Sequence, residues 1–364
     1  MRVMFAGGGT GGHIYPALAV AEEIMVRLPE TEILFIAGTR EIENKIISNA
    51  GYPMKSIPVI GLPRKLTPVF IPFAWKLLQS IFKSRNYMRG FKPSVVMASG
   101  GYVASPPIMA ARTLGVPVVI LEQNSYPGIT NKKLCRFADI VFLGFSDTAK
   151  YFRGKAKTIV TGNPIRRDIG SADRETSSVK FGFIPEKKTV MVCGGSQGSR
   201  AINNTFSTVV KSLADRDIQV LWQTGNRDYN IWKSFEDPYK GKIKIFPFID
   251  NMAAAYGASD IVIARAGAIT TAELTKCGLP AVFVPLPTAA EHHQEHNARA
   301  LANAGAAIMI LEQDLTPQLL EKELLAILLS EERLSAMSEA SRELGKGDAA
   351  GLIAGMIIER YSSN

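Results

Sequence analysis

Short, continuous apolar runs alternate with amphipathic stretches along this chain. In the N-terminal half, runs rich in β-branched residues are expected to form strands at 3–6, 33–37, 94–98, 116–121, 140–142 and 158–160. The amphipathic stretches between them, such as 15–28 and 105–114, are expected to form helices. Strands that are apolar on both faces and alternate with helices predict a parallel sheet covered on both sides.

The same pattern restarts after Lys187. Strands are expected at 189–193, 219–223, 244–246, 261–264, 281–284 and 306–310. A Gly/Pro turn at 161–167, followed by a polar stretch, separates the halves and places a domain boundary near residue 163. We therefore expect domains at 1–163 and 164–344, with the helical segment 345–364 packing back on the first.

Composition fits a folded cytoplasmic protein. The chain is 46% hydrophobic and 21% charged, which is typical of a protein with a sizeable core. Its three cysteines are scattered without metal spacing, a pattern that suits a reducing compartment. The first strand begins at the N-terminus and no apolar run approaches about 18–20 residues, so neither a signal peptide nor a membrane span is expected.

Two glycine-rich turns carry the strongest chemical signal. One spans Gly7 to His13 and the other Gly194 to Arg200, and each follows an expected strand and precedes an expected helix. Such turns bring backbone N–H groups and the positive end of a helix close to phosphate oxygens. One turn in each half predicts two nucleotide-type domains, and a reaction between a phosphate-bearing donor and a second substrate.

Other interpretations of the first turn are weaker. It lacks the G-x-G-x-x-G spacing of a dinucleotide site, and Ala37-Gly38-Thr39 stands where that site needs an acidic residue. The absence of G-K-[ST] excludes a P-loop. Glycines that serve only a tight turn remain the simple alternative.

His13 is a candidate general base. It ends the first glycine turn, just before a helix expected to open near Pro16. An imidazole titrates near neutrality and can take a proton from a hydroxyl. The alternative is a purely structural hydrogen-bond donor.

A second phosphate site is predicted at 265–273. This stretch follows the strand at 261–264, and its small residues allow close approach of a diphosphate to the start of a helix. Glu273, one turn further on, is placed to hold ribose hydroxyls. The alternative is a capping box formed by Thr270 and Glu273.

A histidine cluster at 291–297 suggests a metal site at first sight. His292 and His296 are one helical turn apart, but H-E-x-x-H and a third ligand are missing. No metal is therefore expected. Gln294 and Asn297 are better candidates for contacts to sugar hydroxyls.

The net charge of +9 arises from one region. Between Glu43 and Glu122 there are ten basic residues and no acidic ones. Within residues 62–92, Phe73, Leu77 and Ile81, continued by Ala74, Leu78 and Phe82, form an apolar helical stripe bordered by Lys76, Lys83 and Arg85. This combination predicts a helix lying on an anionic membrane surface. A core helix with solvated lysines is the alternative, and nucleic acid is disfavoured because no known module accompanies the charge.

Taken together, the motifs resemble the MurG family of glycosyltransferases, within glycosyltransferase family 28. The matching stretches run in order from the first glycine turn to the histidine cluster and include 99–107, 122–124, 162–166 and 248–250. The resemblance implies an α/β fold of the GT-B class, with two Rossmann-like domains whose parallel sheets face a central cleft. It also implies that 1–163 binds the acceptor and the membrane, that 164–344 binds UDP-GlcNAc, and that no cofactor is needed.

Family motif positions also imply residue roles. Thr10, Gly11 and Gly12 would approach the donor, Asn124 the sugar and Arg166 the nucleotide. Ser196 would meet the diphosphate, the Ile249 backbone would read the uracil edge, and Gln294 would bind the GlcNAc hydroxyls. Phosphate and ribose would be held by a continuous stretch of Ala268, Ile269, Thr270, Thr271, Ala272 and Glu273. The family has two glutamines where this chain has His293 and Gln294.

The implied reaction is inverting transfer of GlcNAc from UDP-GlcNAc to the C4 hydroxyl of MurNAc in undecaprenyl-pyrophosphoryl-MurNAc-pentapeptide (lipid I). It gives lipid II and UDP in peptidoglycan biosynthesis, at the cytoplasmic face of the bacterial membrane. His13 would remove the hydroxyl proton, while helix N-termini, backbone N–H groups and Arg166 would meet the departing diphosphate. The expected partners are UDP-GlcNAc, lipid I and the anionic membrane surface, and no nucleic acid.

Other functions remain as alternatives. A related GT-B enzyme would use another lipid such as diacylglycerol, or epimerise UDP-GlcNAc without an acceptor; the nearly complete set of family loops disfavours both. A non-catalytic UDP-sugar-binding or membrane scaffold is disfavoured by His13 in an otherwise intact loop. An NAD-dependent oxidoreductase is the weakest alternative.

Overall fold

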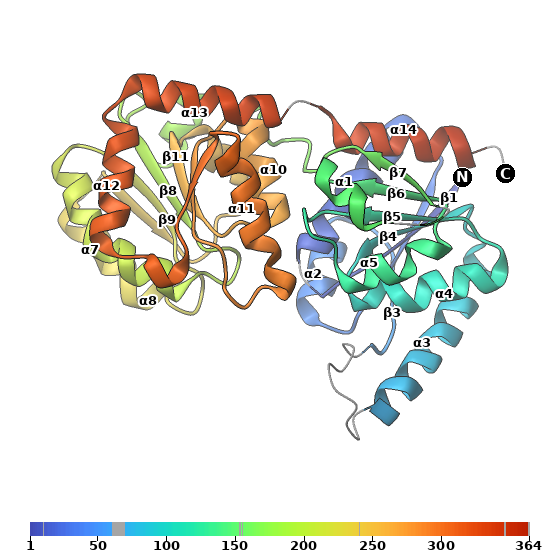
Figure 1. The fold of residues 1–364 in the computed structure, drawn as a ribbon. Coiled ribbons are helices and arrows are strands. Elements are labelled where there is room, and N and C mark those ends of the chain that lie inside the picture. The colour runs from blue at the N-terminus through green and yellow to red at the C-terminus, as the bar shows by residue number, and fades with distance from the viewer. Residues whose placement is uncertain are drawn as a thin grey trace. The chain divides into compact units, whose positions relative to one another are not determined.

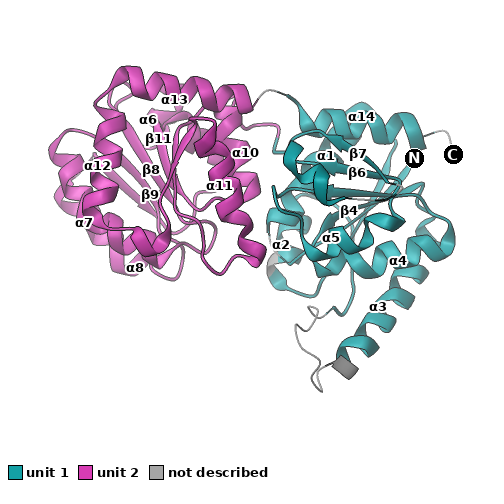
Figure 2. Ribbon diagram, in the orientation of Figure 1, with its two compact units in different colours: residues 1–166, 347–364 teal, residues 167–346 magenta. Residues whose placement is uncertain are grey.

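The computed structural model describes residues 1–9, 11–59, 70–152, 154, 156–239, 241–345 and 347–362, apart from the side chains of Ile42, Phe70 and Ile71. The chain forms two compact units (Figure 2). Unit 1 comprises Met1–Arg166 and Gly347–Asn364, and unit 2 comprises Arg167–Lys346. Each contains a parallel sheet with helices on both faces, which confirms the predicted Rossmann-like α/β fold.

Unit 1 is built on a seven-stranded parallel sheet in the order β3-β2-β1-β4-β5-β6-β7 (Figure 1). Its strands are β1 (Arg2–Gly7), β2 (Glu32–Ala37), β3 (Met54–Ser56), β4 (Val95–Gly100), β5 (Val118–Glu122), β6 (Ile140–Leu143) and β7 (Lys157–Val160). Its helices are α1 (Gly11–Arg27), α2 (Glu41–Asn49), α3 (Phe70–Phe91), α4 (Ser105–Leu114), α5 (Ile129–Leu134) and α14 (Ala349–Tyr361). Short 3₁₀ turns, η1 (Tyr102–Ala104), η2 (Cys135–Phe137) and η3 (Ser146–Tyr151), complete the unit.

Both faces of the central strand β1 are buried. Val3 and Phe5 belong to the core on the α1 and α14 side, whereas Met4 and Ala6 belong to the core on the α3 and α4 side. Because successive side chains of a strand point to opposite faces, a strand covered on both sides needs an uninterrupted apolar run.

Helix α14 comes from the end of the chain and completes the core of unit 1. Ile353, Ile357 and Tyr361 are buried in the same cluster as residues of β1 and α1. The helix begins after Asp348, whose carboxylate accepts the Gly351 N–H at 2.9 Å as an N-cap. In Figure 1 it lies along α1, so residues more than three hundred positions apart share one core.

Unit 2 has a six-stranded parallel sheet in the order β10-β9-β8-β11-β12-β13. Its strands are β8 (Thr189–Cys193), β9 (Gln219–Gln223), β10 (Ile243–Phe246), β11 (Ile261–Ala264), β12 (Ala281–Phe283) and β13 (Ala307–Met309). Its helices are α6 (Arg174–Lys180), α7 (Arg200–Asp215), α8 (Tyr229–Trp232), α9 (Met252–Gly257), α10 (Ala268–Cys277), α11 (His293–Asn303), α12 (Pro317–Leu328) and α13 (Glu331–Leu344). The 3₁₀ turns are η4 (Lys233–Tyr239), η5 (Ala290–His292) and η6 (Glu312–Asp314).

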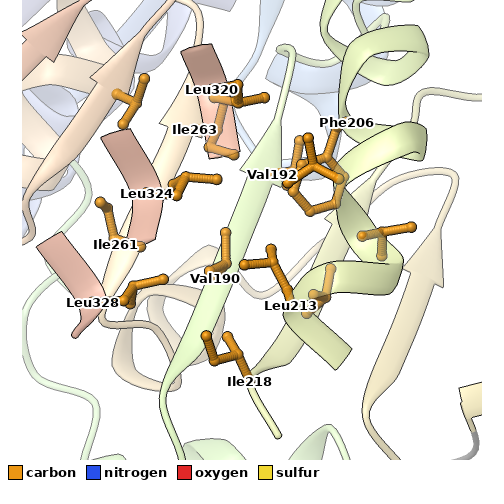
Figure 3. Close-up of a cluster of buried hydrophobic side chains, with 14 of the residues drawn as sticks. Val190, Val192, Phe206, Leu213, Ile218, Ile261, Ile263, Leu320, Leu324 and Leu328 are labelled. Atoms are coloured by element: carbon orange, nitrogen blue, oxygen red, sulfur yellow. The ribbon is translucent and has the colours of Figure 1, made fainter. Parts of the chain in front are cut away.

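Two helices cover one face of this sheet (Figure 3). Val192 of β8 lies beside Phe206 of α7 and Val190 lies near Leu213, while α12 contributes Leu320 and its neighbours at helical spacing to the same buried cluster. The α7 helix starts where Ser199 caps it by accepting the Ile202 N–H. This packing fixes the start of α7, and with it the second glycine turn.

The strand order places both glycine turns at equivalent points. In each sheet the chain proceeds outward from a central strand, β1 or β8, and then continues on its other side with β4 or β11. Ligands of open parallel sheets bind at the carboxyl ends of the strands where the order reverses. These points hold residues 8, 9, 11–13 and 99–101 in unit 1, and 194–199 and 265–268 in unit 2.

The expected strands are all present, with small shifts at their ends, but two local predictions need correction. Strand β3 was not predicted, because its three residues Met-Lys-Ser carry no apolar run; it is an edge strand held by β2. Helix α1 begins at Gly11 rather than near Pro16, which lies inside the helix. His13 is therefore in the first helical turn and not in a loop.

Candidate active site

His13 is held by backbone from β4. Its Nδ1 lies 3.0 Å from the carbonyl oxygen of Ser99. A carbonyl only accepts, so in the neutral ring Nδ1 carries the proton and Nε2 carries the lone pair. This is the tautomer in which Nε2 can act as a base.

Two glycines make this close approach possible. Gly100 and Gly101 have φ of +105° and +74°, which only glycine adopts without strain. A Cβ on Gly100 would lie 2.9 Å from the His13 Nδ1, and one on Gly101 would overlap the carbonyl of Gly8. The Ser99-Gly100-Gly101 backbone therefore positions the imidazole of His13.

The Ser99 carbonyl has a second donor. The buried amide of Gln123 donates to it at 2.6 Å, and the Gln123 carbonyl in turn accepts from Asn163 Nδ2 at 2.9 Å. These contacts join the ends of β4 and β5 and the turn after β7. The role of Gln123 was not predicted, although it stands within the Glu-Gln-Asn motif.

The first glycine turn is anchored by the segment after β2. The buried carboxylate of Glu43 accepts the N–H groups of Gly9 and Gly38, each at 2.7 Å. Arg40 Nη1 donates to the Gly9 carbonyl at 2.8 Å. Sequence reasoning missed both residues, because nothing in their local pattern links them to a turn thirty positions earlier.

Two residues predicted to contact the sugar donor, Gly11 and Gly12, are the first residues of α1, and Gly12 is exposed. Thr10 lies outside the described residues. The guanidinium of Arg166 lies 5.9 Å from the ring centre of Tyr15, so α1 also positions this cation.

Asn124 is oriented by a buried carboxylate. Glu122 Oε1 accepts from the Asn124 N–H at 3.0 Å and from its side-chain amide at 3.2 Å. The other oxygen accepts from Gly128 N–H at 3.0 Å and Asn131 Nδ2 at 2.9 Å. Burial raises the pKa of Glu122, and these donors oppose the rise.

In unit 2, the turn 194–199 packs backbone against backbone. A Cβ on Gly198 or Gly225 would overlap the carbonyl of the facing turn, and both glycines have positive φ. By contrast, Gly195 has φ of +93° with no atom within 4 Å of the position that a Cβ would take, and Ser196 is exposed. The turn is thus rigid at its base and open at Gly195 and Ser196, where an anion has access.

Gln223 links this turn to the predicted uracil contact. Its amide nitrogen donates to the Gly195 carbonyl at 3.1 Å, and its oxygen accepts the Ile249 N–H at 2.8 Å. Since that N–H already donates to Gln223, a uracil ring at this position would be recognised mainly through the Ile249 carbonyl. Gln223 is a further residue that the sequence analysis did not single out.

The start of α10 presents its first-turn N–H groups. Gly267 is the N-cap and Ala268 the first helical residue, so Thr270 lies inside the helix and the capping-box alternative is wrong. Thr271 is buried; its N–H donates to Gly267 and its hydroxyl to the Ala268 carbonyl at 2.8 Å. Ile269 and Thr270 belong to this first helical turn, and anions are favoured at such a helix start.

Glu273 is buried and accepts from the hydroxyl of Tyr256 at 2.9 Å. Burial, followed by the negative charge of Glu273, holds the pKa of Tyr256 well above its usual value, so the phenol stays protonated and donates. Ala272, the neighbour of Glu273, is half-buried.

The histidine cluster places Gln294 in the first turn of α11, where its side-chain oxygen accepts the Leu286 N–H at 3.0 Å. Asn297 is fully buried and donates to the Ala266 carbonyl at 3.1 Å, so it supports the turn before α10. Within the described part of the chain, no three His, Cys, Asp or Glu side chains come together as metal ligands.

Helix α3 shows two faces. Trp75, Leu78 and Phe82 are exposed by 70%, 53% and 62%, while Phe73 and Leu77 line a cavity inside the unit. Residues 62–69 of the predicted membrane segment lie outside the described residues. Of the helices that the structure describes, none combines the length and the apolar character needed to cross a bilayer.

Family comparisons agree with this architecture. Residues 3–143 match the glycosyltransferase family 28 N-terminal domain, and residues 189–353 match the family's C-terminal domain.

Curated relatives match over nearly the whole chain. The chain is 40% identical, over 96% of its length and 97% of the relative's, to the UDP-N-acetylglucosamine--N-acetylmuramyl-(pentapeptide) pyrophosphoryl-undecaprenol N-acetylglucosamine transferase of Thermoanaerobacter sp. (strain X514). It is also 40% identical, over the full length of both chains, to the protein of the same name from Moorella thermoacetica.

Solved structures share the fold. The crystal structure of Acinetobacter baumannii MurG has a TM-score of 0.77 and 30% identity, covering 98% of this chain and 99% of that one. A UDP-GlcNAc 2-epimerase from Neisseria meningitidis bound to UDP-GlcNAc gives a TM-score of 0.69 at 14% identity, over 99% of this chain and all of the other. At that identity the second likeness concerns the fold alone.

Proposed function

This chain belongs to glycosyltransferase family 28, and we propose that it works by direct displacement at the anomeric carbon of UDP-GlcNAc, with His13 as the general base. It is a UDP-GlcNAc-dependent N-acetylglucosaminyltransferase. Its reaction is the step from lipid I to lipid II in peptidoglycan synthesis, the activity for which its full-length relatives are named.

The observation that carries the mechanism is the contact between His13 Nδ1 and the Ser99 carbonyl. It assigns the proton to Nδ1 and the basic lone pair to Nε2. In the proposed step, Nε2 takes the proton of the MurNAc C4 hydroxyl as that oxygen forms a bond to the anomeric carbon. The bond between this carbon and the UDP diphosphate breaks on the opposite face, so the product has inverted configuration.

Unit 2 is proposed to hold the donor. The leaving diphosphate gains negative charge as the bond breaks, and the exposed Ser196 turn and the start of α10 offer N–H groups to it. The N-termini of α7 and α10 add the positive ends of the helix dipoles. Glu273 is proposed to bind the ribose hydroxyls, the Ile249 carbonyl the uracil, and Gln294 the GlcNAc hydroxyls.

Unit 1 is proposed to hold the acceptor. Asn124, fixed by Glu122, would contact the sugar, while Gly11, Gly12 and Arg166 would approach the donor. Residues 1–163 with the C-terminal helix would form the acceptor and membrane domain, and 164–344 the donor domain.

The outer face of α3 supports a peripheral attachment at the cytoplasmic side of the membrane. Trp75, Leu78 and Phe82 are exposed on one side of the helix, beside the exposed lysines Lys76 and Lys83. Apolar side chains next to cations suit a bilayer surface rich in anionic lipids.

UDP release tests the mechanism. We expect release from UDP-GlcNAc only when a lipid I analogue is present, and a rate that falls by roughly 10²–10⁴-fold in His13→Ala. The matched control His296→Ala alters an exposed histidine on α11 and should keep the wild-type rate. Near-normal turnover by His13→Ala would exclude His13 as the general base. UDP release that requires diacylglycerol would assign a different acceptor, and release without any acceptor would assign a different reaction.

A further inference from the structure

Unit 1 contains an apolar cavity of about 230 Å³ between α3, α4 and α5. Its walls include Phe73 and Leu77 from α3, Met109 from α4, and Ile129 and Leu134 from α5. Ile129 is 47% exposed. Apolar cavities of about 150 Å³ accept a hydrocarbon the size of benzene, so this one has room for a longer branched segment.

The cavity adjoins the proposed catalytic turn at Tyr102. Tyr102 lines the cavity, and its ring lies 3.7 Å from the position that a Cβ on Gly9 would take. Tyr102 directly follows Gly101, where an added Cβ would lie 3.4 Å from the ring atom Cδ2 of His13. A ligand that reaches from the His13 region past Tyr102 would therefore enter an apolar space.

The lining also has polar members. Ser105, Thr130 and the exposed Lys133 contribute to the wall. An ammonium and two hydroxyl groups next to aliphatic walls suit an amphiphile with an anionic head and a hydrocarbon chain.

We propose that this cavity binds the first isoprene units of the polyprenyl chain of the acceptor, the segment next to its diphosphate, and that Lys133 supplies positive charge for that diphosphate. The inference rests on the proposed function, because the relatives' substrate is a pyrophosphoryl-undecaprenol. The site is distinct from the outward face of α3, since Trp75, Leu78 and Phe82 are not among the residues that line it.

Direct binding tests the site without turnover. Farnesyl diphosphate, below its aggregation limit and without vesicles, is titrated into the full-length protein by calorimetry, with inorganic diphosphate as the chainless probe. We expect farnesyl diphosphate to bind at least about tenfold more tightly than diphosphate, because burying even two methylene-sized groups is worth that factor. Ile129→Trp and Met109→Trp, which fill the cavity from two different helices, should each remove this advantage.

Two variants serve as controls. Val26→Trp places the same bulk at a 51% exposed position on α1, and Leu78→Ser alters the outer face of α3. Both should bind farnesyl diphosphate like the wild type. Equal affinity for the two probes, or loss of binding in Leu78→Ser but not in the cavity variants, would overturn the proposal.

Kinetics separate this inference from the proposed function. With a soluble lipid I analogue carrying a short prenyl chain, Ile129→Trp should raise the acceptor KM about tenfold and leave the KM for UDP-GlcNAc unchanged. With an analogue that has no chain, the variant and the wild type should have the same KM. A wild type that transfers GlcNAc equally well to both analogues would refute prenyl binding in the cavity but keep the proposed function. A wild type inactive with both would refute the proposed function, and the titration would then decide whether the cavity binds the prenyl chain.

Discussion

The imidazole of His13 contacts the main chain of β4. Its Nδ1–H donates to the Ser99 carbonyl, and the next residue, Gly100, passes so close that a methyl group there would meet the ring. A carbonyl partner fixes the tautomer without adding a negative charge beside the ring. The orientation of this proposed base therefore depends on backbone conformation at Gly100.

Gly100→Ala should damage catalysis without touching a substrate. The new Cβ would lie 2.9 Å from His13 Nδ1, at a φ of +105° that alanine does not adopt without strain. Displacing a catalytic group by about an ångström costs roughly a hundredfold in rate, so we expect kcat to fall by about that factor in steady-state assays, with little change in the KM for UDP-GlcNAc.

Gly115→Ala is the matched control. Gly115 also has positive φ, at +69°, but its Cβ would meet no atom within 4 Å. This variant should lose only about 1 kcal/mol of stability and keep its kcat. Equal kinetic loss in both variants would show that backbone strain, and not the contact with His13, is responsible.

Glu273→Gln tests the proposed ribose contact. Removing a charged acceptor should raise the KM for UDP-GlcNAc about tenfold, since a hydrogen bond to a charged group is worth about 1.5–3 kcal/mol. A donor that lacks the ribose 2′-hydroxyl should show the same loss with the wild type and little further loss with the variant, as a double-mutant cycle requires. Tyr256→Phe keeps the Glu273 carboxylate but removes the hydroxyl that donates to it. If this variant raises the KM for UDP-GlcNAc as much as Glu273→Gln does, and the losses in the cycle are additive, Glu273 has only a structural role.

At the scale of single elements, α3 combines two roles on opposite faces. The side facing the unit buries Ser80, Ser84 and Met88, whereas the opposite side exposes Trp75, Leu78 and Phe82. The sequence pattern put Phe73, Leu77 and Ile81 into one stripe with Leu78 and Phe82, but the structure separates the partly buried members from the exposed ones. The core-helix interpretation thus holds for the inward face, while contact of the outward face with a membrane stays a prediction.

Replacing exposed residues of α3 should weaken membrane binding. Trp75→Ser, Leu78→Ser and Phe82→Ser should each reduce binding to anionic phospholipid vesicles by about tenfold, because full burial of such a side chain is worth about 1.5–3 kcal/mol. Co-sedimentation with vesicles measures the effect. Val179→Ser removes a 65% exposed apolar residue from unit 2 and should change nothing.

The cationic border of α3 should act through charge. Lys76→Glu and Lys83→Glu belong to the same vesicle assay, and each should weaken binding by a factor that shrinks as salt screens the membrane potential. Binding that is unaffected by both the serine and the glutamate variants would remove α3 from the membrane surface.

At the scale of the whole molecule, the chain leaves unit 1 after Arg166 and returns to it at Gly347. The returning α14 supplies part of the core of unit 1, whereas unit 2 is continuous in sequence and closes its own core (Figure 2). Unit 1 cannot complete its core until the last residues of the chain are available.

Ile357→Ala should therefore destabilise unit 1 and spare unit 2. A fully buried isoleucine cut to alanine costs about 2–5 kcal/mol, which for a unit of this size corresponds to a fall of roughly 5–15 °C in its thermal transition. UDP, proposed to bind unit 2, should raise only the other transition in calorimetry. Leu352→Ala, at a 45% exposed position of the same helix, should have a small effect, and a single transition lowered equally by both variants would argue against this assignment.

The local residue pattern is enough to predict the repeated α/β architecture and the elements that carry the proposed site. Parallel strands buried on both faces need continuous apolar runs, and glycines at strand ends are required where backbones approach closely, so both features are visible in the residue pattern. The motif residues His13, Ser196 and Ala268 were identified because they lie beside such glycines in the sequence.

The groups that hold the proposed site in place become visible only in the folded chain. Glu43, Gln123 and Gln223 act on residues up to thirty-four positions away, or across neighbouring strands, so their local sequence carries no sign of the contact. The same holds for the burial of Asn297 and the two faces of α3, because helical periodicity gives the spacing of apolar residues but not which neighbour covers them. Long-range packing settles these points, since it depends on the order in which the strands are arranged in space.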